Sequence, residues 1–444
     1  MANDILRYAE LVEEASYAPV TPYAAANPKS VFIDPRSIAM DVPSESDAIV
    51  PSAFGRAPNR KFAGFYAPSG DFSFSGNVRN LAACLKWVLG GYAYTGGTGG
   101  TAEKQTLTMT AADADGGPYS FQLPNVNNVM LTYNFTAAAG ATAAALATQI
   151  AGGTYSGWTA VAAAGVVTFT RTFAAANTTL GTFAPGTSGA TGTFARTVVG
   201  VAGTMNVHES WGSDTRILPS VQGRFGKDNF EHLFSGMIFD TLSIEVEDEL
   251  AVVTVEANAS KDAKAALQTP SAVLAALPVE VEIPFTQVTV TFNGVVQARK
   301  VKTLTFSVAN NSDPEMGRYL GSRYAGRIPS NERETTIEAE VDFSDTAEIE
   351  RIWGGPSGPT DTGSATFPVE LTFAGSTGQS LVVRLPKFFW QTVETQPEER
   401  EEITQALEGR ALSSSMTLND GVTSIVTDCY TKTLSQAPIV EPAA

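Results

Sequence analysis

The sequence predicts a mainly β protein made of a duplicated unit, with one short helix in each copy and a small β-rich segment inserted into the first copy. Three observations lead to this prediction. Runs that alternate apolar and polar residues recur along the chain and are typical of half-buried strands. A block of Gly-Arg-x-Pro, strand, helix and Gly-Gly occurs twice. One long stretch of the first copy, rich in Ala, Gly and Thr, has no counterpart in the second.

Composition and charge restrict the classes of protein to which this chain can belong. Of its 444 residues, 43% are apolar and 17% are charged, which favours a folded chain over a disordered one. The 46 acidic and 29 basic residues give a net charge of −17. Binding to the outside of a nucleic acid by counterion release requires the opposite sign. An acidic wall past which a nucleic acid slides is compatible with this charge.

The sequence predicts neither a membrane span nor a catalytic or metal centre. No run reaches the ~20 apolar residues of a span, and the N-terminal segment has acidic residues where a signal peptide has basic ones. We therefore expect a soluble protein made inside the cell. Two histidines, two cysteines and a Gly-Gly-Thr-Gly-Gly run that lacks the lysine of a phosphate-binding loop provide no catalytic, cofactor or metal motif. We expect a protein that is not an enzyme and holds no cofactor.

The first repeated block predicts a strand followed by a short helix. Residues 54–91 and 325–355 both run from Gly-Arg-x-Pro through an alternating strand to a helix. Each predicted helix ends at a glycine, Gly90 or Gly354. In the second copy Asp345 and Glu348 are expected to cap the helix N-terminus. The apolar stripes comprise Val78, Leu81, Leu85 and Val88 in the first helix, and Ile349, Ile352 and Trp353 in the second.

The second repeated block predicts two strands joined by an acidic turn. Residues 234–260 and 383–411 share this order, and each block follows the helix of its copy. The turn of the first copy carries Glu245, Glu247, Asp248 and Glu249, and that of the second carries Glu398, Glu399, Glu401 and Glu402. Identity between the blocks is low, so coincidence is the alternative. Order and spacing agree over two separate blocks, which favours a duplication.

Residues 98–205 separate the helix of the first copy from its returning strands. This stretch follows a Gly-rich opening and holds few charged residues. Alternating runs predict strands at 105–110, 129–135, 158–162, 166–172 and 193–201. Residues 140–153 predict a small-residue helix with Leu146 and Ile150 inward. We expect a small inserted β-rich domain with Gly-rich hinges, and the alternative is a disordered low-complexity loop.

These observations divide the chain into units. The predicted parts are a first unit (1–97 and 206–262), the insert (98–205), a linker (263–283) and a second unit (284–444). The second unit opens with two alternating runs around Asn293-Gly294. This dipeptide is the strongest short-range signal for a β-hairpin, because both turn residues need positive φ. We expect the hairpin over residues 285–307.

A charged and aromatic loop precedes the repeated strand of the second copy. It contains Arg323-Tyr324 and Gly326-Arg327-Ile328-Pro329. One interpretation is a turn whose surface ion pairs contribute little to stability. The other is a contact loop between subunits, because Arg and Tyr are enriched at protein interfaces. Composition alone favours neither.

Residues 318–329, which read RYLGSRYAGRIP, together with the strand that follows them to Asp345, resemble the signature region of bacteriophage major tail tube proteins. Asn-Asn-Ser-Asp at 310–313 and the opening YAELVEEASYAPVTP also fit this family. The resemblance is to tube proteins of long non-contractile tails, the siphovirus type. It covers residues 1–95 and 206–430. Residues 98–205 would then be an additional immunoglobulin-like domain of the kind that tail proteins often carry.

The resemblance implies a fold and an assembly. Members of the family fold as a β-sandwich or barrel with a flanking helix, so the chain would hold two tandem tail-tube-type domains and the inserted domain. They form rings that stack into a tube, and DNA is ejected through this tube into the host cell. Most rings contain six tube domains, so three duplicated chains, a homotrimer, would form one pseudo-hexameric ring.

The resemblance also implies partners and a location. The partners are other copies of the chain, the tape measure protein inside the tube, the tail tip and the terminator protein. Double-stranded DNA would pass without specific binding. The protein would belong to the phage tail of the virion, assembled in the host cytoplasm. Two other interpretations stay open: a tail-tip or other virion structural protein, and a carbohydrate-binding β protein.

Two groups of residues are predicted to serve this assembly. The candidate subunit-interface residues are Arg56, Asn293, Gly294, Arg318, Tyr319, Arg323, Tyr324 and Arg327. The candidate acidic lumen residues are Glu245, Glu247, Asp248, Glu249, Glu398, Glu399, Glu401 and Glu402. A wall of like charge repels DNA, whereas Lys and Arg would hold its phosphates. The alternative is that these acidic turns lie on the outer surface and serve only solubility.

Overall fold

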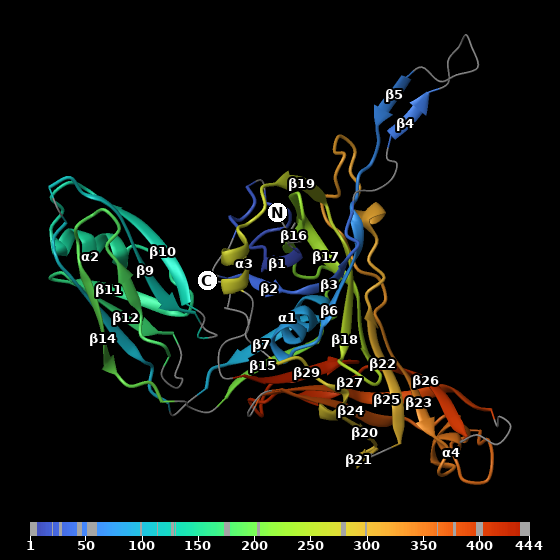
Figure 1. Ribbon diagram of the computed structural model, residues 1–444. Helices are drawn as coiled ribbons and strands as arrows, with labels where there is room; N and C mark the ends of the chain where they lie inside the picture. Colours follow the sequence, from blue (N-terminus) through green and yellow to red (C-terminus); the bar gives the residue numbers. More distant parts are fainter. Residues whose placement is uncertain are drawn as a thin grey trace.

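The computed structural model shows a mainly β molecule with a smaller β body at one side (Figure 1). It describes residues 7–435 except 20, 26–28, 42–46, 51–59, 98–99, 113, 126–127, 129, 173–177, 202–204, 277–280, 298–299, 362, 376–378 and 397–402. Within these residues, strands β1 to β29 and helices α1 to α4 are present. Strands far outnumber helices, which confirms the predicted fold class.

The first unit is built around one long strand, β17 (Phe230–Val246), which belongs to two sheets. Its first half lies in an antiparallel sheet of order β2-β1-β16-β17-β19. A bulge between Phe239 and Thr241 marks the change, and the second half pairs with β18. The other strands of the first sheet are β1 (Arg7–Glu13), β2 (Val31–Ile33), β16 (Val221–Lys227) and β19 (Lys261–Ala265).

The second half of β17 lies in a sheet that joins the two units, which we term the shared sheet. Its order is β3-β6-β18-β17-β22-β23-β26-β25, and every pairing is antiparallel. The first four strands come from the first unit and the last four from the second, so β17–β22 is the seam between them. The other strands are β3 (Pro35–Ile38), β6 (Ser69–Ser75), β18 (Val252–Asn258), β22 (Val301–Ala309), β23 (Glu334–Asp342), β25 (Ser380–Gln396) and β26 (Thr404–Ala411).

The first half of β25 belongs to a further sheet, of order β20-β24-β25-β29-β15-β7. Two strands of the first unit, β15 and β7, therefore extend a sheet of the second. Its strands are β20 (Val288–Phe292), β24 (Phe367–Ala374), β29 (Tyr430–Ser435), β15 (Asn206–Gly212) and β7 (Gly90–Thr95). Small hairpins are formed by β4 (Asp47–Val50) with β5 (Arg60–Ala63), and by β27 (Ser414–Thr417) with β28 (Ser424–Thr427).

The two units repeat one topology. Strands β1, β16, β17 and β19 pair with one another as β20, β24, β25 and β29 do. Strands β3, β6 and β18 likewise correspond to β22, β23 and β26. Both long strands have 17 residues, and the bulge of β25, between Trp390 and Thr392, matches that of β17.

Each unit places a short helix where the sequence predicts one. α1 (Val78–Leu89) follows Asn77, whose side chain accepts a backbone hydrogen bond of the first turn. It ends at Gly90, which adopts φ 81°. α4 (Ala347–Trp353) ends at Gly354, with φ 70°. Both glycines occupy the left-handed conformation that closes a helix without a steric penalty.

Of the two residues predicted to cap α4, only Asp345 hydrogen-bonds to the helix N-terminus. Asp345 accepts a hydrogen bond from the backbone N of Ala347 at 3.1 Å. Glu348 does not cap the helix: it is buried, and its carboxylate accepts a hydrogen bond of 2.6 Å from the indole of Trp390. A buried indole N–H needs an acceptor, and Glu348 supplies it. Trp353, expected in the apolar stripe, is 37% exposed.

One hydrophobic core extends through both units. In the first, the Trp87 ring of α1 packs edge-on against Phe239 at 5.6 Å between centroids. In the second, Trp390 of β25, which occupies the position of Phe239 directly before the bulge, packs edge-on against Phe292 at 5.4 Å. Because the buried side chains of β17 and β22 belong to the same cluster, the two units pack as one body.

Residues 104–198 form two sheets around a core of their own. The orders are β10-β9-β13 and β11-β12-β8-β14. Phe121 and Phe169, from different sheets, lie 5.6 Å apart between ring centroids. Helix α2 (Ala143–Ala151) buries Leu146 and Ile150, as predicted. The strands are β8 (Lys104–Met109), β9 (Gly117–Pro124), β10 (Met130–Ala137), β11 (Trp158–Ala163), β12 (Val166–Arg171), β13 (Thr182–Ala184) and β14 (Gly192–Val198).

The predicted hairpin at 285–307 is only partly correct. Asn293 and Gly294 form the turn, with φ 49° and 77°, but β20 pairs with β21 (Val295–Val296) over just two residue pairs. The chain then leaves the hairpin, and β22 pairs with β17 and β23. There β22 buries its alternate apolar side chains in the core, which the hairpin would leave exposed.

The segment expected as a linker, 263–283, includes the end of β19 and helix α3 (Pro270–Ala276) among its described residues. A closed barrel is not formed by the described strands of a single chain: β3 and the second half of β25 lie at the two edges of the shared sheet.

Candidate functional site on the shared sheet

The shared sheet has one buried face and one open face. In β22, for example, Leu304, Phe306 and Val308 are buried, whereas the residues between them are partly exposed. The open face is rich in hydroxyl and carboxylate groups. One row across five strands, assembled from the residue pairings, comprises Ser73, Thr254, Ser243, Ser307 and Thr336.

Two pairs of carboxylates lie directly opposite each other on this face. Asp71 of β6 faces Glu256 of β18, and Glu338 of β23 faces Glu408 of β26. On their other sides, Glu256 pairs with Thr241 of β17 and Glu408 pairs with Thr392 of β25. Thr241 and Thr392 are each the first residue after the bulge of their strand. The two pairs therefore occupy the same position in the two units.

The like-charged pairs give the open face an uncompensated negative charge. Directly opposed like charges on a sheet are destabilising, on the order of 0.2–1 kcal/mol per pair. Among the described residues, no ion pair involves any of the four carboxylates. Arg410 lies in the neighbouring Ser/Thr row, opposite Thr336, but it is bound to Glu332 at 2.9 Å and Glu334 at 3.2 Å.

The predicted lumen residues are divided between the open face and one end of the sheet. Glu245 is exposed on the open face, opposite Val252 and Thr305. Glu247, Asp248 and Glu249 lie in the exposed turn after β17. Glu398, Glu399, Glu401 and Glu402 lie outside the residues that the structure describes.

The predicted interface residues fall at opposite ends of the same sheet. Along the seam, Thr241 of β17 lies opposite Ala309 of β22, and Val246 lies opposite Leu304. The acidic turn therefore lies at the start of β22, and the Asn293-Gly294 hairpin lies beside it, since Val296 lines the same groove as Glu247 and Val301. We term this end of the sheet the turn end. The loop 310–333 follows the other end of β22, the loop end, where the β4–β5 hairpin also projects (Figure 1).

Among the predicted interface residues of the loop, Arg323 and Tyr324 make close contacts with the first unit of their own chain. Arg323 O accepts a hydrogen bond from Tyr66 N at 2.9 Å, and its Nε donates to Gly64 O at 3.1 Å. The rings of Tyr324 and Tyr66 meet edge-on at 6.1 Å. Tyr66 in turn donates a 2.7 Å hydrogen bond to Asp262. Arg323 and Tyr324 thus hold the two units together.

The other predicted interface residues at the loop end face solvent. Arg318 and Arg327 are exposed, and Tyr319 is 51% exposed. The guanidinium of Arg318 lies 3.8 Å from the carboxylate of Glu315 and 5.9 Å from the centre of the Phe65 ring of the first unit. Arg56 lies outside the described residues.

The comparison with known families agrees with this architecture. A family model described as phage tail tube protein matches residues 183–411, just over half of the chain. The chain belongs to the phage tail tube protein family. No curated protein matches the sequence. Family membership makes this a structural component of the virion that assembles with itself and with other tail proteins.

In this tail tube protein both histidines are engaged within the fold. The Nδ1 of His208 lies 2.7 Å from the hydroxyl of Tyr92, and burial, with nearby Lys86 and Arg79, lowers the pKa of His208 to about 4. The Nε2 of His232 lies 2.8 Å from Asp262. In the part of the chain that is described, no group of three His, Cys, Asp or Glu residues is placed to hold a metal, and no helix has the length and apolarity of a membrane span.

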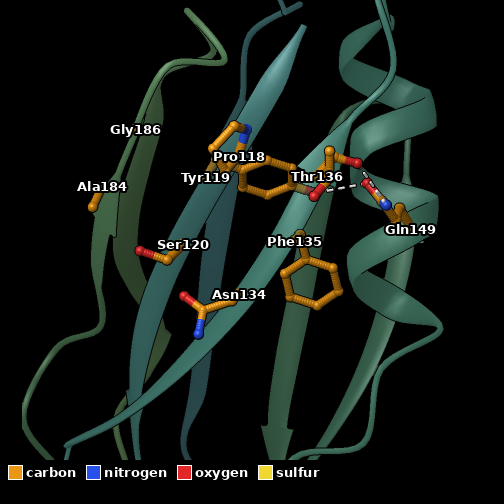
Figure 2. A pocket seen from close by; sticks show the side chains of 9 residues that line it. All are labelled: Pro118, Tyr119, Ser120, Asn134, Phe135, Thr136, Gln149, Ala184 and Gly186. Carbon is orange, nitrogen blue, oxygen red and sulfur yellow. Dashed lines mark hydrogen bonds between the residues drawn. The ribbon is translucent and has the colours of Figure 1, made fainter.

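A shallow groove of about 650 Å³ lies in the inserted body (Figure 2). The amide of one lining residue, Gln149 of α2, is used within the protein: Oε1 accepts from the hydroxyl of Tyr119 at 2.9 Å, and Nε2 donates to Thr136 O at 3.0 Å. The other lining residues are Pro118, Ser120, Asn134, Phe135, Ala184 and Gly186. Nothing in its chemistry connects this groove to the shared sheet.

The sequence reasoning missed the carboxylates on the strands of this tail tube protein. It selected acidic residues in turns because they are clustered in sequence, whereas Asp71, Glu256, Glu338 and Glu408 are brought together only by strand pairing. The available signal was the polar phase of the alternation, as in Thr-Thr-Ile-Glu-Ala-Glu-Val-Asp of β23. Its polar phase, Thr336, Glu338, Glu340 and Asp342, indicates an open face with hydroxyl and carboxylate groups.

Proposed function

We propose that three chains close a ring and that stacked rings form the channel for DNA ejection. The seam β17–β22 supports this proposal, because it already joins one unit to the next through six residue pairs. Among the described strands, β3 and the second half of β25 each have a neighbour on one side only. Pairing β25 with β3 of the next chain would repeat the seam, and closing the ring would remove both exposed edges.

In this proposal the open face of the shared sheet is the wall of the channel. Its opposite face is occupied by the core, so this face alone is free to line a lumen. Three chains supply six copies of the acidic position, which makes Asp71–Glu256 and Glu338–Glu408 a repeated negative lining. Phosphates of passing DNA would be repelled rather than bound, because bound phosphates need Lys or Arg.

The proposed tube belongs to a long non-contractile tail of the siphovirus type. It would enclose the tape measure protein before DNA passes, and its two ends would meet the tail tip and the terminator protein. Assembly would take place in the host cytoplasm. The opposed carboxylates on the open face are the observation that supports the channel most directly, since they cost stability and recur in both units.

Charge reversal on the open face tests the proposed channel. Glu256→Lys combined with Glu408→Lys places two cations per chain among the wall residues, and each adds a phosphate contact. We expect rings and tubes to assemble, and DNA ejection from virions to slow by about tenfold or more at low salt, with partial recovery at high salt. Ejection would be followed by dye release from receptor-triggered particles.

Two controls separate the position of the charge from its amount. Val161→Lys adds a cation on the inserted body, where this side chain is 66% exposed, and should leave ejection unchanged. Glu256→Gln with Glu408→Gln removes charge without adding a phosphate ligand. Unchanged ejection in the Lys variant would reject the channel wall, and native mass spectrometry showing six chains per ring would reject the trimer. Rings that never form tubes would favour a tail-tip protein.

A further inference from the structure

We propose that successive rings are held together by one contact between copies of this chain, in which the loop 310–333 of one copy docks on the groove and acidic turn of the next. This inference rests on the proposed function and names the two surfaces through which rings stack. It is carried by the position, shape and charge of the two ends of the shared sheet.

The two surfaces lie at opposite ends of one strand. β22 starts beside the groove at Val301 and ends at Ala309, directly before the loop. Nine residues of strand at ~3.3 Å each separate the surfaces by about 30 Å. A translation of one copy along the strand direction therefore brings its loop end onto the turn end of the next.

The loop end presents apolar side chains on a fixed base. Leu320 is 104% exposed, Met316 is 56% exposed and Tyr319 is 51% exposed. Gly326 N donates a 3.0 Å hydrogen bond to Gly317 O across the base of the loop. Below the loop, a small cluster of Leu218, Ile238, Ala325 and Ile328 is buried. The exposed apolar residues are thus pre-positioned, which lowers the entropy cost of binding.

The turn end offers a matching apolar groove. It has a volume of about 230 Å³, and its apolar lining comprises Val246, Phe285, Val288, Val290, Val296, Val301 and Leu304. Phe285 is 46% exposed, Val295 is 60% exposed and Val296 is 55% exposed. Neighbouring apolar side chains with this much exposure mark a surface that is covered in an assembly.

Charge is complementary between the two ends. The groove is flanked by Glu247, Asp248 and Glu249. Two lysines of the turn end are already used, since Lys300 lies 2.5 Å from Asp345 and Lys302 lies 3.1 Å from Asp342. The loop end carries the exposed cations Arg318 and Arg327.

A second copy of the chain is therefore the occupant that fits both surfaces. Each end would repel its own kind, so two copies do not pair symmetrically. A contact between two different surfaces at opposite ends repeats without closing, and this geometry produces a filament of rings. Opposed charges would fix the register of one ring on the next.

Charge reversal at both ends tests the contact. Arg318→Glu with Arg327→Glu makes the loop end acidic, and Glu247→Arg with Asp248→Arg makes the turn end basic. Each double variant should form trimeric rings by native mass spectrometry but raise the concentration needed for tubes by about tenfold or more. The quadruple variant, with both reversals, should recover tubes. Leu320→Ser should also suppress tubes, whereas Val161→Ser on the inserted body should not.

Each outcome bears on one proposal. Wild-type tubes together with normal tubes from both double variants would overturn the ring contact and leave the proposed function standing. Loss of tubes in the quadruple variant, with rings intact, would also overturn it, because complementarity predicts recovery. A wild-type chain that forms no rings or tubes would reject the proposed function, and the contact with it.

Discussion

Asp428, between β28 and β29, and Arg333, directly before β23, form a buried pair in the second unit. The Nε of Arg333 donates to Asp428 at 3.1 Å, and the hydroxyl of Thr335 donates at 2.6 Å. Burial alone would raise the pKa of Asp428, but the hydrogen bonds and the charge of Arg333 outweigh it and hold the pKa below its usual value. The pair also engages the backbone of Ser213 through Arg333.

Removing one partner of this pair should be costly. Asp428→Ala leaves a buried guanidinium uncompensated and is expected to lower the free energy of unfolding by ~3 kcal/mol. Glu370→Ala breaks the exposed pair of Glu370 with Arg384, which has a 2.6 Å separation, and should cost less than ~1 kcal/mol. Denaturant unfolding of both variants beside the wild type measures the difference. Equal losses would contradict a structural role for the buried pair.

The pH dependence of this pair has a definite sign. Because the pKa of Asp428 is lowered in the folded state, its stabilisation is complete above the unfolded value of ~3.9 and is lost as pH falls below it. The melting temperature of Asp428→Asn should therefore fall less than that of the wild type between about pH 5 and 3. Parallel curves for the two proteins would show that Asp428 does not contribute through its charge.

Single residues were predictable where the constraint is local. The two helix-ending glycines and the Asn293-Gly294 turn were predictable because a helix end and a tight hairpin turn each require positive φ at these positions. All four residues adopt positive φ. Glu348 was not predictable, because its role depends on Trp390, which is distant in sequence. The opposed carboxylates were missed for the same reason.

At the scale of strands, neutralising the carboxylate pairs should stabilise the fold. Glu256→Gln removes the repulsion from Asp71, and Glu408→Gln removes that from Glu338. Each change is expected to raise the free energy of unfolding by about 0.2–1 kcal/mol. Thermal unfolding at low salt would show this most clearly, because salt screens exposed charges.

Glu245→Gln is the matched control for this prediction. Glu245 lies on the same open face, but its direct neighbours are Val252 and Thr305, which carry no charge. Its neutralisation should leave the melting temperature unchanged. Stabilisation by all three changes alike would point to total charge rather than to the opposed pairs.

Strands were predictable where apolar and polar residues alternate regularly. They were less predictable where pairing with a distant strand determines whether a segment forms a strand or which partner it takes. The predicted runs in the insert correspond to β8, β10, β11, β12 and β14, but β9 and β13 were missed. β13 has only three residues and is stabilised by its pairing with β9. Similarly, β22 was assigned to a hairpin because the turn signal is local, whereas its partners β17 and β23 are selected by burial of its apolar face.

At the scale of the molecule, the duplication was visible in sequence but the seam was not. Matching blocks show that two units exist, yet nothing local indicates that β17 of one pairs with β22 of the other. This pairing joins the two units into one continuous sheet. One edge of the sheet, β3, belongs to the first unit, and the other, the second half of β25, belongs to the second. The proposal of a three-chain ring follows from those edges rather than from the repeat alone.

The inserted body should be dispensable for tube assembly. It has its own core, and the strands on either side of it, β7 and β15, pair directly, with Thr95 opposite Val207. A short Gly-Ser linker in place of residues 98–205 therefore closes a hairpin between two strands already side by side. The insert would project from the outer wall, since a body of this size inside would block a channel for duplex DNA about 20 Å wide. We expect the deletion variant to form tubes of normal length and smaller outer diameter by electron microscopy. A deletion variant that folds, by circular dichroism and cooperative melting, yet forms no rings would show that the insert takes part in assembly.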